Sequence, residues 1–108
     1  MVMNSQLISN LRMWIDEELG QLQAAGAECG WGENADSAGN DPVFWIHIDH
    51  GSRGGKVSLW RSNDVELILV DADGDEDPSY THFSPQDVSE LERIINRLVA
   101  WVGAEGTG

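Results

Sequence analysis

The segment Val43–Asp71, VFWIHIDHGSRGGKVSLWRSNDVELILVD, decides the fold. Three runs within it are rich in β-branched and aromatic residues, a composition typical of strands. They are separated by Gly51–Gly55, which we interpret as a flexible turn, and by Ser62–Asp64. Both connections are too short for a parallel crossover, which needs about a dozen residues. We therefore expect antiparallel neighbours that form a β-meander, with strands at 43–50, 56–61 and 65–71.

The predicted strands divide into two sets of side chains, because successive side chains of a strand point to opposite faces of a sheet. One set is entirely apolar, so we expect helices to cover that face. It consists of Phe44, Ile46, Ile48, Val57, Leu59, Val65, Leu67 and Leu69. The other set is mixed, and it consists of Val43, Trp45, His47, Asp49, Lys56, Ser58, Trp60, Glu66, Ile68 and Val70.

The mixed face is the candidate binding surface. Aromatic side chains framed by charges are typical of protein-binding patches, so Trp45, His47, Trp60 and Ile68 are candidate contact residues. In an alternative interpretation, Trp45 and Trp60 stack across the meander beneath a loop formed by residues 27–42.

Two amphipathic helices flank the predicted strands. Apolar residues recur at intervals of three and four from Ser5 to about Ala25, with Gly26 as the stop. A second helix is predicted to follow Ser84 as its N-cap, with Pro85 at the first helical position and Gly103 at its end. Phe83 and Val88 are placed to form a hydrophobic staple around that cap. Two short segments, Ala27–Gly32 and Ser79–Phe83, are candidates for additional strands, with Cys29 and Trp31 on one face of the first.

These elements predict an α+β fold in which an antiparallel meander of three to five strands carries an N-terminal and a C-terminal helix on one face, in the order α-β-β-β-α. The length of 108 residues fits one domain, 1–108, with a flexible tail at 104–108.

Charge excludes several classes of function. The chain has 6 basic and 19 acidic residues, so its net charge is 6 − 19 = −13. Nucleic acids and anionic membrane surfaces would repel it, whereas a basic protein would be attracted. A hydrophobic content of 41% with five tryptophans indicates a folded chain. No apolar run approaches the roughly 20 residues of a membrane span, and residues 1–10 lack the pattern of an export signal, so we expect a cytoplasmic protein.

The acidic run after the third predicted strand, DADGDED, resembles the start of a calcium-binding loop. A helix–loop–helix calcium site requires glycine at position 6 and glutamate at position 12. Counted from Asp71, these positions hold Glu76 and His82, so the pattern fails. We interpret the run as an acidic rim for a basic partner, and its candidate contact residues are Asp71, Asp73, Asp75, Glu76 and Asp77.

Neither a metal site nor a catalytic site is expected. His47 and Asp49 would share one strand face, but His50 would point away from them, and His82 would have to fold close as a third ligand. Cys29 has an acidic neighbour and no basic one, so nothing local activates its thiol. The chain contains no nucleophile elbow or phosphate-binding glycine motif, and we expect no cofactor.

The order of motifs resembles a known family. LRMWIDEEL is followed by DPVFWIHID, GKVSLW, VELILVDADG, a His-Phe pair and LERIINRLVAW. This arrangement, which covers nearly the whole chain, resembles the TriTu-type immunity proteins of bacterial polymorphic toxin systems. The resemblance implies a small cytoplasmic protein that binds a cognate secreted ADP-ribosyltransferase toxin, whose target is elongation factor Tu.

The leading hypothesis is therefore an immunity protein that occludes the active or target-binding site of a basic toxin domain. An acidic adaptor or chaperone-like module for another basic partner is the alternative, and it would bind without abolishing toxicity. A third hypothesis is an enzyme or metal sensor built on the histidines.

Overall fold

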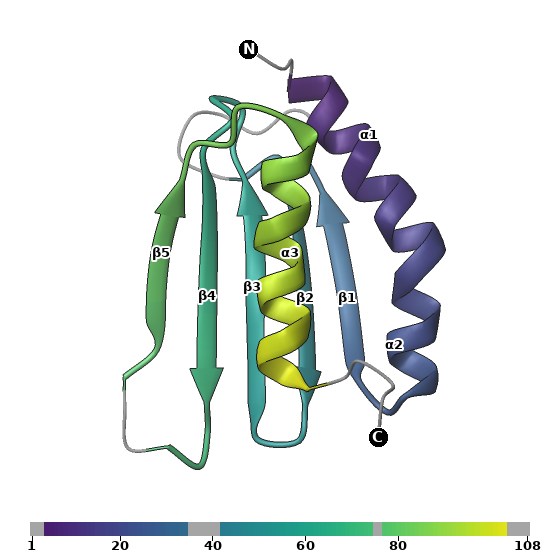
Figure 1. Cartoon of the computed structure of the whole chain (residues 1–108), viewed down its shortest axis with the longest axis vertical. Coiled ribbons are helices and arrows are strands. Elements are labelled where there is room, and N and C mark those ends of the chain that lie inside the picture. The colour runs from purple at the N-terminus through teal and green to yellow at the C-terminus, as the bar shows by residue number, and fades with distance from the viewer. Residues whose placement is uncertain (1–3, 35–41, 75–76, 104–108) are drawn as a thin grey trace.

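The computed structural model describes residues 4–34, 42–74 and 77–103, and the expected tail at 104–108 lies outside them. The described chain is an α+β fold in the predicted order, with a helical N-terminal segment, a sheet and a C-terminal helix (Figure 1). The helical elements are α1 (Asn4–Trp14), the π-helical η1 (Ile15–Leu19), α2 (Gly20–Ala24) and α3 (Val88–Val102). The strands are β1 (Glu28–Glu33), β2 (Phe44–His50), β3 (Arg53–Leu59), β4 (Val65–Asp71) and β5 (Ser79–Phe83).

The strands form one antiparallel sheet in the order β1-β2-β3-β4-β5, which confirms the predicted meander. The two segments that were candidates for additional strands, near 27–32 and at 79–83, are the two edge strands, β1 and β5. Cys29 and Trp31 share one face of β1, as expected, because they pair with Ile48 and Ile46 of β2.

The glycine-rich connection is shorter than predicted. Gly51 and Ser52 alone form the turn, and β3 begins at Arg53, so the interpretation of Gly51–Gly55 as a turn is wrong. Gly54 and Gly55 are strand residues that make room for neighbours on opposite faces of the sheet. A Cβ on Gly54 would collide with the carboxylate of Asp49, and one on Gly55 would lie 2.5 Å from Cδ1 of Leu98 on α3.

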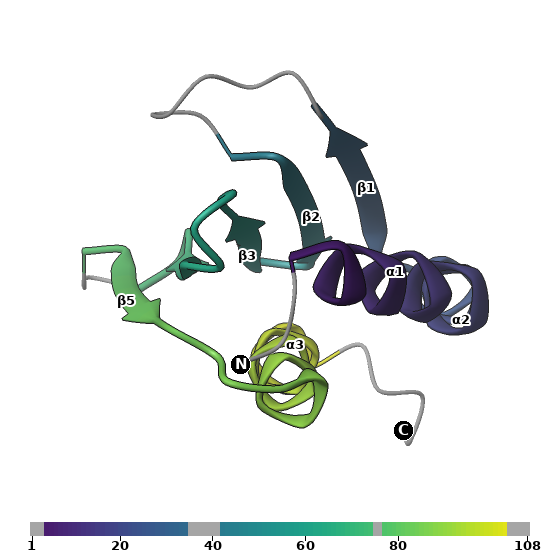
Figure 2. The same cartoon turned by 90° about the horizontal axis from the view of Figure 1, so that it is seen from above.

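The N-terminal helical segment and α3 form one layer on one face of the sheet, and Figure 2 shows α1, α2 and α3 together on that side. The apolar set predicted to face the helices is buried, except for Leu69, which is half-buried. Each fully buried side chain of this size contributes about 1.5–3 kcal/mol, so this layer supplies most of the stabilising free energy. The strand residues at its centre are Phe44, Ile46, Ile48, Val57, Leu59, Val65 and Leu67, and Leu91, Ile95 and Leu98 are the fully buried residues of α3.

The π-helical turn of η1 follows from the spacing of the buried residues. Leu7, Leu11, Ile15 and Leu19 recur every four residues, and all are buried. An α-helix has about 3.6 residues per turn, so a step of four residues rotates about 40° beyond one full turn. Over the three steps from Leu7 to Leu19, the stripe would drift around the helix by about 120°. A wider turn at Ile15–Leu19 returns Leu19 to the sheet side. The helical segment ends before Gly26, which has a φ of 100°.

The N-terminus of α3 differs from the prediction. Its N-cap is Asp87, whose side chain accepts a hydrogen bond of 2.9 Å from the backbone N–H of Glu90. The assignment of Ser84 as the cap is therefore wrong, because its hydroxyl instead donates to Oδ1 of Asp64 at 3.2 Å. Pro85 is buried ahead of the helix and is not its first residue. The predicted end is confirmed, since Gly103 has a φ of 70°.

No helix in the described part of the chain is long and apolar enough to span a membrane.

Candidate binding surface

The sheet face opposite the helices, which we call the open face, carries the mixed set of side chains with two exceptions: Val43 precedes β2 and is buried in the core, and Trp60 follows β3. Ser58 lies on this face but is buried as well. The strand register aligns this face in rows across the sheet, because antiparallel Cα partners point to the same side. Two of these rows are Gly32, Trp45, Ser58, Glu66, His82 and Gly30, His47, Lys56, Ile68, Tyr80. Figure 2 shows no described helix over this face.

Glycines of β1 make room for the large side chains of β2. The Trp45 indole lies over Gly32, and the His47 imidazole lies over Gly30, so closely that a Cβ on either glycine would collide with the ring. Trp45 is consequently half-buried, and the ammonium group of Lys56 lies 6.0 Å from its ring centroid. The two rings are thus held flat against the sheet before any partner binds, which lowers the entropy lost on association.

Sequence reasoning missed Tyr80. Its side chain is 65% exposed, and it pairs with Ile68 across β4 and β5. Val70, on the same face, is 36% exposed. Alternation in SYTHF places Tyr80 and His82 on one face, but the assignment of that face required the register with β4. Tyr80 and Ile68 therefore extend the aromatic and apolar surface toward the β5 edge.

Trp60 lies just beyond β3, in the turn that leads to β4. Its backbone N–H donates to the carbonyl oxygen of Asp64 at 2.9 Å. Trp60 and Trp45 are both half-buried. Of the loop that was expected to cover them in the alternative interpretation, residues 28–33 form β1, and residues 35–41 lie outside the described residues.

The described part of the acidic run lies away from Trp45 and Trp60. The connection between β4 and β5 that contains it is at the bottom of Figure 1, whereas the turn between β3 and β4 is at the top. From Glu66, in the same row as Trp45, to Asp71 is five residues of strand, or about 17 Å. Asp73 and Asp77 are exposed, and Asp75 and Glu76 lie outside the described residues.

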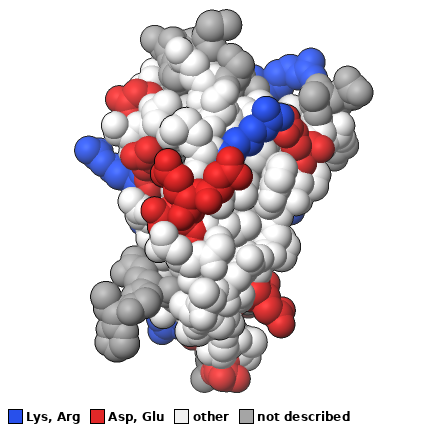
Figure 3. Space-filling view, turned by 90° about the vertical axis from the view of Figure 1, so that its right-hand side faces the viewer, with Lys and Arg blue, Asp and Glu red and all other residues white. Residues whose placement is uncertain are grey.

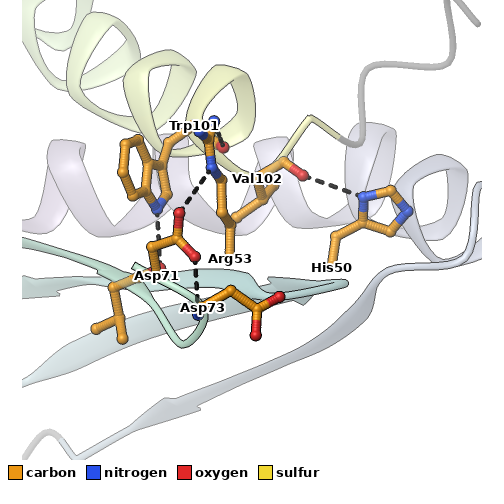
Figure 4. Close-up of polar contacts among 7 residues, drawn as sticks. His50, Arg53, Asp71, Asp73, Trp101 and Val102 are labelled. Carbon is orange, nitrogen blue, oxygen red and sulfur yellow. Dashed lines mark hydrogen bonds and ion pairs between the residues drawn. The ribbon is translucent and has the colours of Figure 1, made fainter. Parts of the chain in front are cut away.

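Asp71 belongs to a cluster that fixes the C-terminal end of α3 (Figure 4). Arg53 lies 3.5 Å from the Asp71 carboxylate, stacks 4.5 Å from the ring of Trp101 and donates to the Trp101 carbonyl oxygen at 3.3 Å. The Trp101 indole N–H donates to the carbonyl oxygen of Val70 at 3.1 Å, and Nδ1 of His50 lies 3.0 Å from that of Val102. We call these contacts the C-terminal clamp. They engage carbonyl groups that the end of a helix leaves without partners.

The Asp71 carboxylate is stabilised in its charged form. A backbone N–H from Asp73 donates to it at 3.1 Å, and this bond, followed by the contacts with Ser52 and Arg53, holds the pKa of Asp71 below its usual value. Arg53 pairs with Asp71 on the helix side of the sheet, so this carboxylate lies away from the open face.

Replacing Trp101 with alanine should destabilise the fold by about 2 kcal/mol, because the half-buried ring and the bond to Val70 are both lost. Trp101→Phe keeps an aromatic ring beside Arg53 but removes the donor, so about 1 kcal/mol is expected. Urea unfolding monitored by circular dichroism measures both. Wild-type stability of Trp101→Ala would show that the clamp does not hold α3.

The histidines do not converge. His47 lies 3.7 Å from Asp49, His82 lies 3.1 Å from Asp64, and His50 faces the end of α3. His82, on β5, is separated from β2 by two strands. Within the described residues, no three His, Cys, Asp or Glu side chains are grouped to hold a metal ion.

Cys29 is half-buried on the helix side of β1, and burial, followed by the charge of Asp49, raises the pKa of its thiol. The reactive species is the thiolate, so we expect iodoacetamide at pH 8 to alkylate Cys29 several-fold more slowly than glutathione. Asp49→Asn should accelerate the reaction, since it removes the neighbouring negative charge. Mass spectrometry of timed samples measures both rates, and alkylation as fast as that of glutathione would contradict the expectation.

Carboxylates gather on the helix side of the molecule. Asp16, Glu17 and Glu18 are exposed on η1, and Glu92 is exposed on the facing side of α3. Glu17, Glu18 and Glu92 line a groove of about 300 Å³ between these helices. Figure 3 looks onto the α1–α2 side and shows a group of acidic side chains, with a basic side chain and uncharged surface beside it. The carboxylates near η1 thus form a second acidic group, on a different part of the molecule from the acidic run.

The open face combines aromatic, apolar and charged side chains, a composition typical of protein-binding patches. The family model described as Immunity protein TriTu matches residues 9–101, so the chain belongs to this immunity protein family. The family resemblance inferred from the sequence is thereby confirmed. No curated protein and no solved structure matches the chain. Membership of an immunity family implies that the protein binds a cognate toxin protein.

Proposed function

We propose that this protein neutralises a secreted ADP-ribosyltransferase toxin of a bacterial polymorphic toxin system, whose target is elongation factor Tu, and that it does so in the cytoplasm of the producing cell. The observation that carries the proposal is the match to the immunity family over residues 9–101. The toxin activity and its target, elongation factor Tu, are inferred from the resemblance of the motifs quoted above.

The mechanism that we propose is steric occlusion by the open face. An inhibitor of this kind supplies no chemistry, because it only has to occupy the surface at which NAD or the target protein would bind. Trp45, Ile68 and Tyr80 provide the aromatic and apolar contacts, and His47 and Lys56 provide the polar ones. A few aromatic residues commonly carry most of the binding free energy of an interface.

Electrostatic attraction supports rapid capture. A net charge of −13 attracts a basic toxin domain and raises the association rate, which matters when the toxin acts in the same cell. Long-range steering acts on the whole molecule, so the carboxylates near η1 contribute to it without touching the toxin. The exposed Asp73 and Asp77, beyond the end of β4, would lie at the margin of the contact.

Co-expression tests this function. Cells that express the cognate toxin domain should survive when this protein is co-expressed, and elongation factor Tu isolated from them should remain unmodified. The purified pair should form a stable complex on gel filtration. Failure of rescue would overturn the proposal. A complex that leaves the toxin active would instead support the adaptor alternative.

A further inference from the structure

A small pocket lies between the end of β5 and α3, on the helix side of the sheet. Its volume is about 310 Å³. Phe83, Pro85 and Ile94 provide its apolar wall, and two cations, Arg93 and Arg97, lie at its rim, one helical turn apart on α3. The Arg97 guanidinium lies 5.6 Å from the Phe83 ring centroid. We call this site the arginine pocket.

The two arginines differ from Arg12 and Arg53, which form ion pairs. Arg12 pairs with Glu33, and Arg53 pairs with Asp71. Among the residues that the structure describes, neither Arg93 nor Arg97 forms an ion pair. Glu90 also lines the pocket, but its carboxylate accepts a hydrogen bond of 2.6 Å from the backbone N–H of Gln86.

We infer that the arginine pocket receives an acidic side chain, with an apolar side chain beside it, from an extended segment of the partner protein. Guanidinium groups bind carboxylates through paired, charge-assisted hydrogen bonds, and the Phe83 wall accommodates the apolar neighbour. The identity of the partner as the toxin rests on the proposed function. The chemistry of the pocket does not, because it follows from the residues that line it.

The position of the pocket favours a polypeptide as the occupant. β5 is an outer strand of the sheet, and its outward edge carries no further strand within the described residues. An extended segment can add to such an edge through main-chain hydrogen bonds. Phe83 is the last residue of β5 and pairs with Val65, so its ring lies on the helix side. Alternate side chains of an added strand would point to the same side.

A small probe tests the chemistry without the toxin. We expect 3-phenylpropionate, titrated into the ¹⁵N-labelled protein, to shift amide signals of residues 83–97 saturably. The uncharged 3-phenylpropanol should bind at least about tenfold more weakly, because it cannot accept the charge-assisted hydrogen bonds. Arg93→Gln combined with Arg97→Gln should remove the difference, whereas Arg12→Gln should not. Equal binding of the two probes, or no saturable shift, would overturn the inference.

Binding to the toxin domain distinguishes this inference from the proposed function. Arg97→Gln should raise the Kd for the toxin about tenfold, whereas Arg12→Gln, which removes an equal charge, should change it little. An unchanged Kd for Arg97→Gln would overturn the role of the pocket and leave the immunity function standing. Charge-dependent binding of the probe without any binding of the toxin would support the chemistry of the pocket and overturn the proposed immunity function.

Discussion

Alanine at Gly55 is expected to destabilise the fold by about 3 kcal/mol, a large fraction of the stability of a domain this size. The added Cβ would lie against the carbonyl oxygen of Ile68 and 2.5 Å from Cδ1 of Leu98. A backbone carbonyl within a sheet cannot move aside, and Leu98 is fully buried. Either α3 must lift from β3 or the pairing of β3 with β4 must distort. Both changes weaken the centre of the core.

Thermal unfolding measures this effect, with a fall in Tm of about 15 °C expected. Gly20→Ala is the matched control, because Gly20 is helical and a Cβ there would meet nothing within 4 Å. It should raise stability by up to about 1 kcal/mol, since alanine favours a helix more than glycine does. A Tm of Gly55→Ala close to that of the wild type would show that α3 does not rest on Gly55.

Gly55 also shows why some of the fold could not be predicted from the sequence. Glycine beside glycine is the usual signal of a turn, and nothing in GSRGG distinguishes a turn glycine from one that accepts a leucine of a distant helix. The apolar alternation of the strands was predicted correctly, because it depends only on neighbours within each strand. Features that depend on contacts between elements were missed.

The N-cap of α3 has a similar explanation. Ser84 and Asp87 are both good cap residues, three positions apart. Asp64, distant in sequence, accepts the Ser84 hydroxyl, and the backbone N–H of Glu90 donates to Asp87. The contact of Ser84 with Asp64 and the hydrogen bond from Glu90, the third helical residue, therefore decide that Asp87 is the N-cap.

The candidate site was predicted only in part. Alternation placed Trp45, His47 and Ile68 on one face, and the register of the sheet agrees with that placement. Tyr80 was missed because its face depends on how β5 pairs with β4. The partner of Asp71 was missed as well, because Arg53 was assigned to a turn and is in fact the first residue of β3.

Replacing Trp45 with alanine should raise the Kd for the toxin about 100-fold, and co-expressed cells should lose most of their protection. Trp45 is held flat between Gly32 and Lys56, so its truncation removes a pre-ordered aromatic contact. Most of the change should be in the dissociation rate, because the net charge that steers association stays the same. Surface plasmon resonance separates the two rates.

Because Trp45 is half-buried, its truncation also affects folding, so a second variant is needed. Tyr80→Ala removes a 65% exposed ring from the same face and should leave the Tm nearly unchanged while raising the Kd about tenfold. Met13→Ala is the matched control, because Met13 is 58% exposed on α1, in the helical layer behind the sheet. Weakened binding by Met13→Ala, with wild-type binding by both open-face variants, would place the toxin on the helical side. The carboxylates near η1 would then be in contact with the toxin instead of attracting it from a distance.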